Sequence, residues 1–237
     1  IVNISMTLFY VPNLATEHVL SEEESLHAVK VLRLQAGDKL VVVDGVGGYH
    51  IAKITLPHPK RCAFELIESQ FEFGKRDYKL HIAIAPTKNM DRLEWFVEKA
   101  TEIGIDEITP IICRFSERKM VKAERLEKII VSAAKQSVKA YFPKLNPQCT
   151  FDELIKNHQA TQKFIAHCYD SEKRQLKTEI VPAKDMLVLI GPEGDFSKEE
   201  VDKAIKNGFL PVSLGESRLR TETAGVVACH TVSLMNQ

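Results

Sequence analysis

The sequence contains no apolar run that approaches the roughly 20 residues needed to cross a lipid bilayer, which argues against a membrane protein. Residues 1–6 carry no basic stretch, so we expect no signal peptide there. Hydrophobic residues make up 44% and charged residues 27% of the 237 positions, values that are typical of a soluble globular protein. A chain of this length forms one large or two small domains and buries a core without disulfides.

Cysteine is scarce and shows no pattern that would indicate a cross-linked or metal-binding protein. There are five cysteines, an odd number, and no two of them have C-x-x-C spacing. The eight histidines form no H-x-x-x-H pair, and a catalytic zinc ion needs three converging protein ligands. The sequence therefore predicts no disulfide framework, no metal, and a location in a reducing cytoplasm.

The chain also has no excess charge of either sign, because 32 basic residues balance 32 acidic ones. The balance holds for the whole chain but not for each part of it. The stretch from Arg114 to Lys144 contains nine Lys or Arg residues and only three glutamates. Such a basic stretch suits RNA phosphates, although charge alone favours a solvated helix face.

Residues 1–72 are predicted to form a small β-rich domain. Strands are expected at residues 8–11, 39–43, 49–54 and 61–67. Ser21 begins a helix with glutamates in its first turn, and apolar residues continue that helix as far as Leu34 before Gly37 ends it. Short strands at this spacing favour a compact barrel.

Residues 73–237 show alternating strands and helices and predict an α/β domain. Strands are expected at residues 80–85, 108–112, 164–167, 186–190 and 211–214, and helices at 91–103, 123–140, 197–207 and 221–235. The strand at residues 186–190 is apolar throughout, which indicates a central parallel strand covered on both faces.

Two consecutive strands end in loops that carry glycine and lead into helices. The first loop reads Gly191-Pro192-Glu193-Gly194-Asp195-Phe196, and the second begins at Leu214-Gly215. Ligands of open α/β sheets bind at the carboxyl ends of strands, so these loops are a candidate site, although two ordinary turns would look similar. The chain has neither G-x-x-x-x-G-K-[ST] nor a strand followed by G-x-G-x-x-G, which excludes the two common phosphate cradles. Backbone groups at such turns can still hold an adenine edge and a ribose.

At these residues the sequence resembles a known enzyme family. The stretch Leu189-Ile190-Gly191-Pro192-Glu193-Gly194, the pair Leu214-Gly215 and the run Leu219-Arg220-Thr221-Glu222-Thr223-Ala224 are similar to the RsmE family of 16S ribosomal RNA uridine N3 methyltransferases, which belongs to the SPOUT superfamily. The resemblance covers essentially the whole chain. It extends to His27–Arg33 with Gly37-Asp38, to Lys88 with Glu98–Gly104, and to Ala133–Ser137.

The resemblance implies a fold, a cofactor and partners. The expected fold is a PUA-like β-barrel over residues 1–72, followed by a SPOUT methyltransferase domain with a trefoil knot over residues 73–237. The implied cofactor is S-adenosyl-L-methionine, the substrate is 16S ribosomal RNA or the small ribosomal subunit, and the enzyme is a homodimer with its cofactor pocket near the subunit interface. The knot rests on the resemblance alone, because chains rarely thread loops.

The sequence departs from the family pattern at two places. The family usually has a second glycine where Asp195 stands, and often Arg-Ile where Ser217-Arg218 stand. These departures lie in the two glycine-bearing loops, so they concern the rim of the expected cofactor site.

The resemblance also assigns candidate site residues. Arg220 is the candidate that stabilises the anion formed at uridine N3, and Glu222 is a candidate base or orienting residue, although Glu222 also suits a helix cap and Arg220 a partner carboxylate. Cofactor contacts are expected at Leu189, Gly191, Pro192, Glu193, Gly194, Leu214, Gly215, Leu219 and Thr223. RNA contacts are expected at Lys30, Arg33, Lys88, Lys135 and Gln136.

Two other functions fit the same sequence. One is a different SPOUT RNA methyltransferase, for example one that methylates a ribose 2′-hydroxyl of transfer RNA. The other is a non-catalytic RNA-binding factor of ribosome assembly that kept the fold.

Overall fold

The computed structural model describes residues 7–158, 160–170 and 172–237, so the stretch in which we expected no signal peptide lies outside the described residues. Residue contacts divide the chain into two compact units. The first contains the residues up to Lys75 together with Ala134–Phe142, and the second contains Arg76–Ala133 and Pro143–Gln237. The predicted boundary between two functional domains after residue 72 stays a prediction. The return of residues 134–142 to the first unit was not foreseen.

The first unit is built on a four-stranded sheet. Its strands are β1 (Leu8–Tyr10), β2 (Lys39–Val43), β3 (Tyr49–Leu56) and β4 (Ala63–Gln70), in that order, with β1 and β2 parallel and the other pairs antiparallel. Alternate residues point into one core, which contains Phe9, Leu40, Val42, Ile54 and Phe64. The β-rich unit is therefore confirmed. Within residues 7–75 the sheet has β1 and β4 as its two ends, so a closed barrel stays a prediction.

The helix predicted near residue 21 begins as expected and ends early. Ser21 accepts a hydrogen bond from the Glu24 backbone N–H at 3.2 Å and caps α1 (Glu22–Leu26). A wide helical turn, η1 (His27–Val31), follows it. Arg33 then has a φ of 57°, which ends the helical conformation, so the predicted continuation through Leu34 is wrong.

The second unit contains a mostly parallel sheet whose order is β10–β12–β9–β11–β5–β6–β7, with β8 also paired to β6. Its strands are β5 (Leu80–Ile84), β6 (Glu107–Ile112), β7 (Lys144–Leu145), β8 (Cys149–Thr150), β9 (Gln162–Ala166), β10 (Arg174–Gln175), β11 (Met186–Ile190) and β12 (Leu210–Ser213). The apolar β11 pairs in parallel with β9 on one side and β5 on the other, which confirms the predicted central strand. The α/β class is confirmed with it.

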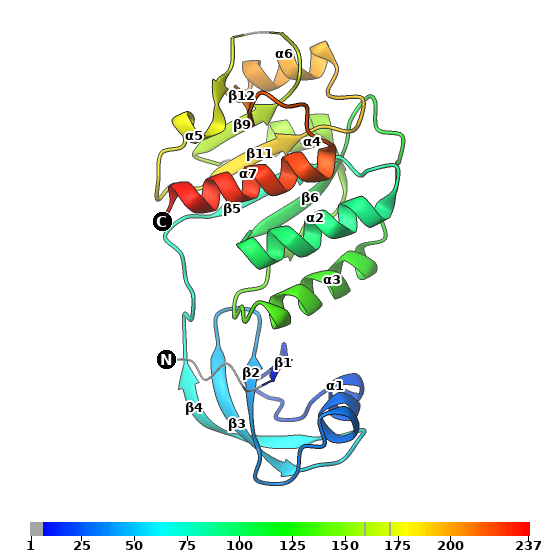
Figure 1. Cartoon of the computed structure of the whole chain (residues 1–237), viewed down its shortest axis with the longest axis vertical. Helices are drawn as coiled ribbons and strands as arrows, with labels where there is room; N and C mark the ends of the chain where they lie inside the picture. Colours follow the sequence, from blue (N-terminus) through cyan, green and yellow to red (C-terminus); the bar gives the residue numbers. More distant parts are fainter. Residues whose placement is uncertain (1–6, 159, 171) are drawn as a thin grey trace. The chain divides into compact units, whose positions relative to one another are not determined.

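Helices lie on both faces of this sheet. The helices beyond residue 89 are α2 (Met90–Ile103), α3 (Ala123–Gln136), α4 (Phe151–Asn157), α5 (Leu176–Glu179), α6 (Lys198–Lys206) and α7 (Thr221–Met235), and α3 runs from the second unit into the first. Figure 1 shows α2 and α7 side by side in front of β5 and β11, and the two helices contact each other. Phe151 of α4 and Val201 of α6 share one core cluster with Leu187 and Leu189 of β11, so α4 and α6 cover the opposite face.

The sequence placed the end of one helix wrongly and missed another helix. The long helix α3 ends at Gln136 rather than near residue 140, because Val138 has a φ of 55° and the chain turns there. The helix α4 was not predicted, although Thr150 and Glu153 form a capping box at its start, with the Glu153 N–H donating to Thr150 Oγ1 at 3.2 Å. Its seven residues are too few to show a clear helical period.

Candidate active site

Three loops meet at one edge of the parallel sheet. β9, β11 and β12 are neighbours in the sheet and run parallel, so their carboxyl ends lie together. The loops that follow these strands bring residues near 167, 191 and 215 into one region. This is the edge at which ligands of open α/β sheets bind.

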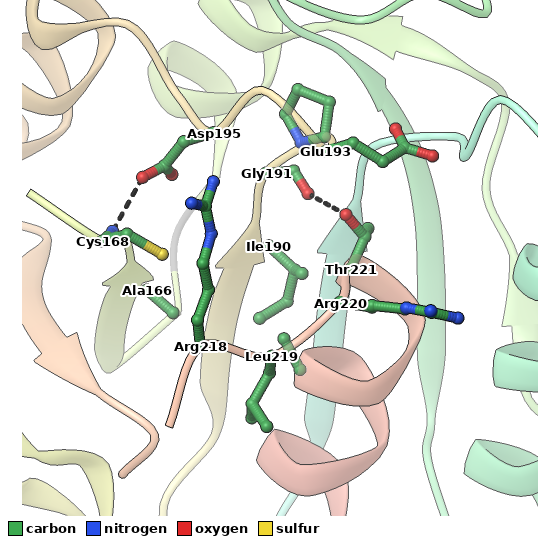
Figure 2. A pocket seen from close by; sticks show the side chains of 12 residues that line it. Ala166, Cys168, Ile190, Gly191, Glu193, Asp195, Arg218, Leu219, Arg220 and Thr221 are labelled. Atoms are coloured by element: carbon green, nitrogen blue, oxygen red, sulfur yellow. Dashed lines mark hydrogen bonds between the residues drawn. The ribbon is translucent and has the colours of Figure 1, made fainter. Parts of the chain in front are cut away.

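The loop after β11 is a tight turn whose glycines have little room for a side chain. The Asp195 N–H donates to the Pro192 carbonyl at 2.9 Å and closes the turn. A Cβ at Gly191 would lie 3.1 Å from the Phe196 ring and 3.1 Å from the Phe196 nitrogen, and one at Gly194 would lie 3.1 Å from Cβ of Phe115. The Thr221 hydroxyl donates to the Gly191 carbonyl at 3.1 Å and ties this turn to the start of α7 (Figure 2).

Asp195 stands in a backbone conformation that normally favours glycine. Its φ is 67°, in the left-handed region, where a short polar side chain with a local hydrogen bond is the usual alternative. Its carboxylate accepts the Phe196 N–H at 2.8 Å and the Cys168 N–H at 2.7 Å. The aspartate therefore fits a turn built for glycine and also fixes the loop after β9.

After this turn the chain enters α6, whose first residues form a complete capping box. Ser197 Oγ accepts the Glu200 N–H at 3.2 Å, and Glu200 accepts the Ser197 N–H at 2.8 Å. The second carboxylate oxygen of Glu200 accepts the Arg114 N–H at 2.8 Å. The capping predicted for α6 is confirmed, and it also fixes the loop after β6 beside the same edge.

The loop after β12 bends at Gly215, whose φ of 130° suits glycine. The Ser213 hydroxyl donates to the Gly215 carbonyl at 2.9 Å and accepts the Gly215 N–H at 3.2 Å. The chain then passes Arg218 and Leu219 and enters α7 at Thr221, with extended backbone at Arg220. The two glycine-bearing loops predicted from the sequence are therefore neighbours.

The three loops enclose two adjoining clefts with volumes of about 270 and 570 Å³. Both clefts are lined by Ala166, Cys168, Asp195, Arg218, Leu219 and Ala224. The smaller cleft adds Ile190, Gly191, Pro192, Glu193, Arg220 and Thr221. The larger one adds His167, Tyr169, Lys173, Gly194, Val212, Ser213, Leu214, Gly215, Glu216 and Ser217. Apolar walls with a few charged groups suit an amphipathic small molecule.

Burial and nearby charges shift the pKa values of titratable groups in the larger cleft, among them His167 and Cys168. Burial, with a contribution from Lys173, lowers the pKa of His167, so this ring is neutral at pH 7. Burial raises the pKa of the Cys168 thiol, the Asp195 carboxylate raises it further, and Arg218 opposes the shift. The thiol is therefore not activated as a nucleophile.

Comparison with known proteins places the chain in a family. Residues 75–233 match a family described as RNA methyltransferase domain, and residues 20–67 match the RNA methyltransferase PUA domain. The ribosomal RNA small subunit methyltransferase E of Buchnera aphidicola is 30% identical over 225 residues, which cover 92% of this chain and 88% of that protein. The chain belongs to the ribosomal RNA small subunit methyltransferase E family.

Solved structures agree with this assignment. A probable rRNA-methyltransferase from Porphyromonas gingivalis is 42% identical, with a TM-score of 0.90 over 97% of this chain and 99% of that one. A ribosomal RNA small subunit methyltransferase E from Neisseria gonorrhoeae, solved bound to S-adenosyl methionine, is 26% identical, with a TM-score of 0.84 over 98% of each chain. The resemblance stated from the sequence to the RsmE family is confirmed, and so is the PUA-like nature of the first domain.

Most residues that the family resemblance assigned to the cofactor line the two clefts. Those that do so are Gly191, Pro192, Glu193, Gly194, Leu214, Gly215 and Leu219. Leu189 does not, because its side chain belongs to the core on the α4 and α6 face. Thr223 lies outside both linings as well, one turn into α7. The roles of all nine assigned residues as cofactor contacts stay predictions.

The sequence reasoning missed the third loop. Ala166, His167, Cys168, Tyr169 and Lys173 follow β9 and line the larger cleft, yet they contain no glycine and form no motif. The one available signal was the expected strand at residues 164–167, whose carboxyl end must lie beside that of β11 if both strands are parallel.

The two candidate catalytic residues of this family member differ in position. Arg220 is exposed and lines the smaller cleft, with its side chain directed away from Arg218 (Figure 2). Glu222 is buried and lines neither cleft; its Oε1 lies 3.8 Å from Nε of Arg92 on α2. Within the described residues its Oε2 has no hydrogen-bond partner. Arg92 was not foreseen from the sequence.

The candidate RNA-binding residues fall into both units. Lys88, in the second unit, donates its backbone N–H to Glu193 Oε1 at 2.9 Å, and its ammonium pairs with Glu117 at 2.8 Å. Lys30, Arg33 and Gln136 are exposed in the first unit. Lys135, in the same unit, forms an ion pair with Glu24 and lies over the ring of Phe9, which gives it a structural role whatever it contacts in RNA.

Among residues 7–158, 160–170 and 172–237, no group of three or more His, Cys, Asp or Glu side chains is placed to hold a metal ion. Nor does that part of the chain contain a helix long and apolar enough to span a membrane.

Proposed function

We propose that this chain transfers a methyl group from S-adenosyl-L-methionine to N3 of a uridine in 16S ribosomal RNA. The observation that carries the proposal is the pair of adjoining clefts formed by the loops after β9, β11 and β12, in a member of the ribosomal RNA small subunit methyltransferase E family. The name of the family specifies the small subunit. The target atom N3 and the location in the cytoplasm are parts of the proposal.

The residues present fit an adenosyl group. Ala166, Ile190, Leu219 and Ala224 provide apolar walls against which a purine can pack. Side chains are missing where the backbone must approach a ligand, since Gly215 has open space beyond its Cα. The combined clefts have the several hundred Å³ that a nucleoside with an amino-acid tail requires.

Bound S-adenosylmethionine supplies a methyl group that is already activated by a sulfonium, so the protein mainly has to orient the reactants. Arg220 stands at the rim of the smaller cleft, where its guanidinium can stabilise the negative charge that develops when uridine N3 loses its proton. Glu222 is buried against Arg92, and this position favours orienting the start of α7 over direct removal of a proton. We therefore propose Arg220 as the catalytic residue and Glu222 as its positioning residue.

The target base has to leave its stacked position to reach this cleft, so we propose that it is flipped out of the RNA. Lys88, Lys30, Arg33, Lys135 and Gln136 are the candidates for contacts to the RNA backbone. The affinity for RNA is then expected to fall steeply as salt rises.

We also propose the knot and the homodimer that the family resemblance implied. Support for a subunit interface comes from α7, whose sequence is apolar around most of its circumference although one side faces solvent. Val226 and Val227 are half-buried and Leu234 is exposed in the described chain. A helix that is hydrophobic all round is normally covered.

Two measurements test the proposed function. Mass spectrometry of 16S ribosomal RNA from a strain that lacks the gene should show one uridine without its N3 methyl group, and the purified protein should restore the group with S-adenosylmethionine. An unchanged ribosomal RNA would contradict the proposal; loss of a ribose methyl group in transfer RNA would favour the other SPOUT function. Absence of cofactor binding in calorimetry would favour the non-catalytic assembly factor.

A second test separates the roles of the residues. Arg220→Ala should abolish methyl transfer and leave the affinity for cofactor within about twofold, because the side chain is exposed and points away from Arg218. Loss of both activity and cofactor binding would refute this assignment.

A further inference from the structure

Two residues of opposite charge, Asp195 and Arg218, line the same two clefts. Asp195 belongs to the loop after β11 and Arg218 to the loop after β12, and they are 23 positions apart in the sequence. Figure 2 shows the Arg218 side chain extending from its loop toward Asp195, next to Cys168. Two different loops therefore place opposite charges at the junction of the two clefts.

The Asp195 carboxylate is fixed in place. Its two oxygens accept the Phe196 and Cys168 backbone N–H groups at 2.8 and 2.7 Å, so its position is set by the frame of two loops rather than by a mobile side chain. Each carboxylate oxygen keeps a free lone pair, because a carboxylate can accept about four hydrogen bonds. A cationic donor can therefore still bind from the side of the cleft.

Arg218 is a cation at the junction of the two clefts and remains available to a ligand. The Lys173 ammonium donates to the carbonyl oxygens of His167, at 2.9 Å, and Tyr169. Arg220 points the other way (Figure 2). In the described part of the chain, the Arg218 guanidinium has no hydrogen bond and no ion pair within 4.0 Å. A guanidinium binds a carboxylate through two parallel hydrogen bonds.

We propose that Arg218 and Asp195 form the subsite for the amino-acid tail of S-adenosylmethionine, with Arg218 binding its carboxylate and Asp195 its ammonium group. This inference rests on the proposed function. The tail carries one negative and one positive charge on neighbouring atoms, and the protein presents the complementary pair. An RNA phosphate offers no partner for Asp195, whose charge disfavours a second anion at the same place.

Calorimetry with two ligands that share the nucleoside tests the proposal. S-adenosylhomocysteine retains the amino-acid tail, whereas 5′-methylthioadenosine lacks it. Arg218→Ala should weaken binding of S-adenosylhomocysteine by roughly 10- to 100-fold, the range for a charge-assisted hydrogen bond, and should change the affinity for 5′-methylthioadenosine by less than about twofold. Arg218→Lys, which keeps the charge, should recover part of the loss.

Asp195→Gly tests the other half of the subsite. Glycine tolerates the φ of 67°, so the variant is expected to fold. It should weaken binding of S-adenosylhomocysteine more than that of 5′-methylthioadenosine. Arg61→Ala is the matched control, because it removes an exposed arginine that lines neither cleft; both affinities should stay within about twofold.

The outcomes are distinguishable from those of the proposed function. If the wild-type protein binds neither ligand, the proposed function fails and the subsite falls with it. If the wild-type protein binds S-adenosylhomocysteine and Arg218→Ala weakens both ligands equally, or neither, the subsite alone is refuted. If Arg218→Ala weakens binding of an RNA oligonucleotide but leaves S-adenosylhomocysteine unaffected, Arg218 is a phosphate contact and the inference is overturned.

Discussion

The contact between α7 and α2 gives a prediction in which two effects of opposite sign compete. Gly225 lies on the buried face of α7. A Cβ at this position would lie 2.6 Å from two ring carbons of Phe96 and 3.1 Å from Cδ1 of Ile84. Both neighbours are fully buried, so neither can move into solvent. Gly225→Ala should therefore destabilise the protein.

The magnitude follows from the two opposing terms. Replacing glycine by alanine inside a helix stabilises it by about 1 kcal/mol. Forcing an extra methyl group into a close-packed interface costs about 1–3 kcal/mol, and contacts as short as 2.6 Å place this site in the upper part of that range. The net loss should be about 1–2 kcal/mol, which lowers the thermal unfolding midpoint by roughly 2–8 °C for a chain of this size.

Differential scanning calorimetry of Gly225→Ala and four companion variants checks this reasoning. Comparing His230→Ala with His230→Gly, at an exposed position of the same helix, calibrates the helix term alone. Adding Phe96→Leu to Gly225→Ala should cost less than the sum of the two single changes, because the smaller side chain makes room for the methyl group. An increase in the unfolding midpoint for Gly225→Ala would refute the packing argument.

Three further predictions follow from the hydrogen bonds of the second unit. Thr221→Val removes the buried hydrogen bond to the Gly191 carbonyl. It should lower the free energy of unfolding, measured by urea titration, by about 1–3 kcal/mol and weaken cofactor binding several-fold. An unchanged cofactor affinity would show that this hydrogen bond does not hold the turn. Ser197→Ala removes the α6 cap and should cost about 1–2 kcal/mol, whereas Ser197→Asp should retain most of it. Burial and the neighbouring His158 lower the pKa of His81 from 6.5 to about 4. Between these pH values the unfolded chain binds a proton that the folded chain does not. The free energy of unfolding should therefore fall by up to about 3 kcal/mol on acidification from pH 6.5 to pH 4. His81→Gln should flatten this part of the stability curve, and an equal slope in both proteins would contradict the shift.

The sequence predicted best where a pattern was long or had a chemical cause. The apolar run of β11 identified the central strand, and the serine and glutamate at positions 197 and 200 identified the start of α6. The ends of helices were harder. α3 and the first helix stop at residues with positive φ, Val138 and Arg33, and neither residue type favours that conformation. Tertiary contacts, rather than local preference, set those ends.

The site was predicted in part for the same reason. Two of its three loops carry glycines, and their positions after consecutive strands made them visible. The loop after β9 carries none, and its place in the cleft depends on the order of strands in the sheet, which no local pattern encodes. For Glu222, the family resemblance suggested a base or an orienting residue, and no local pattern indicated that the structure would bury it against Arg92.

The order of the strands has a consequence for how the protein matures. The clefts need the loops after β9, β11 and β12, all of which lie beyond residue 165, while β11 must pair with β5 about 100 positions earlier in the chain. During synthesis the N-terminal parts can fold first, yet nothing can recognise a nucleoside until the last strands have been inserted beside β5. Under the proposed function, cofactor binding therefore requires that the chain has been synthesised and folded as far as the loop after β12.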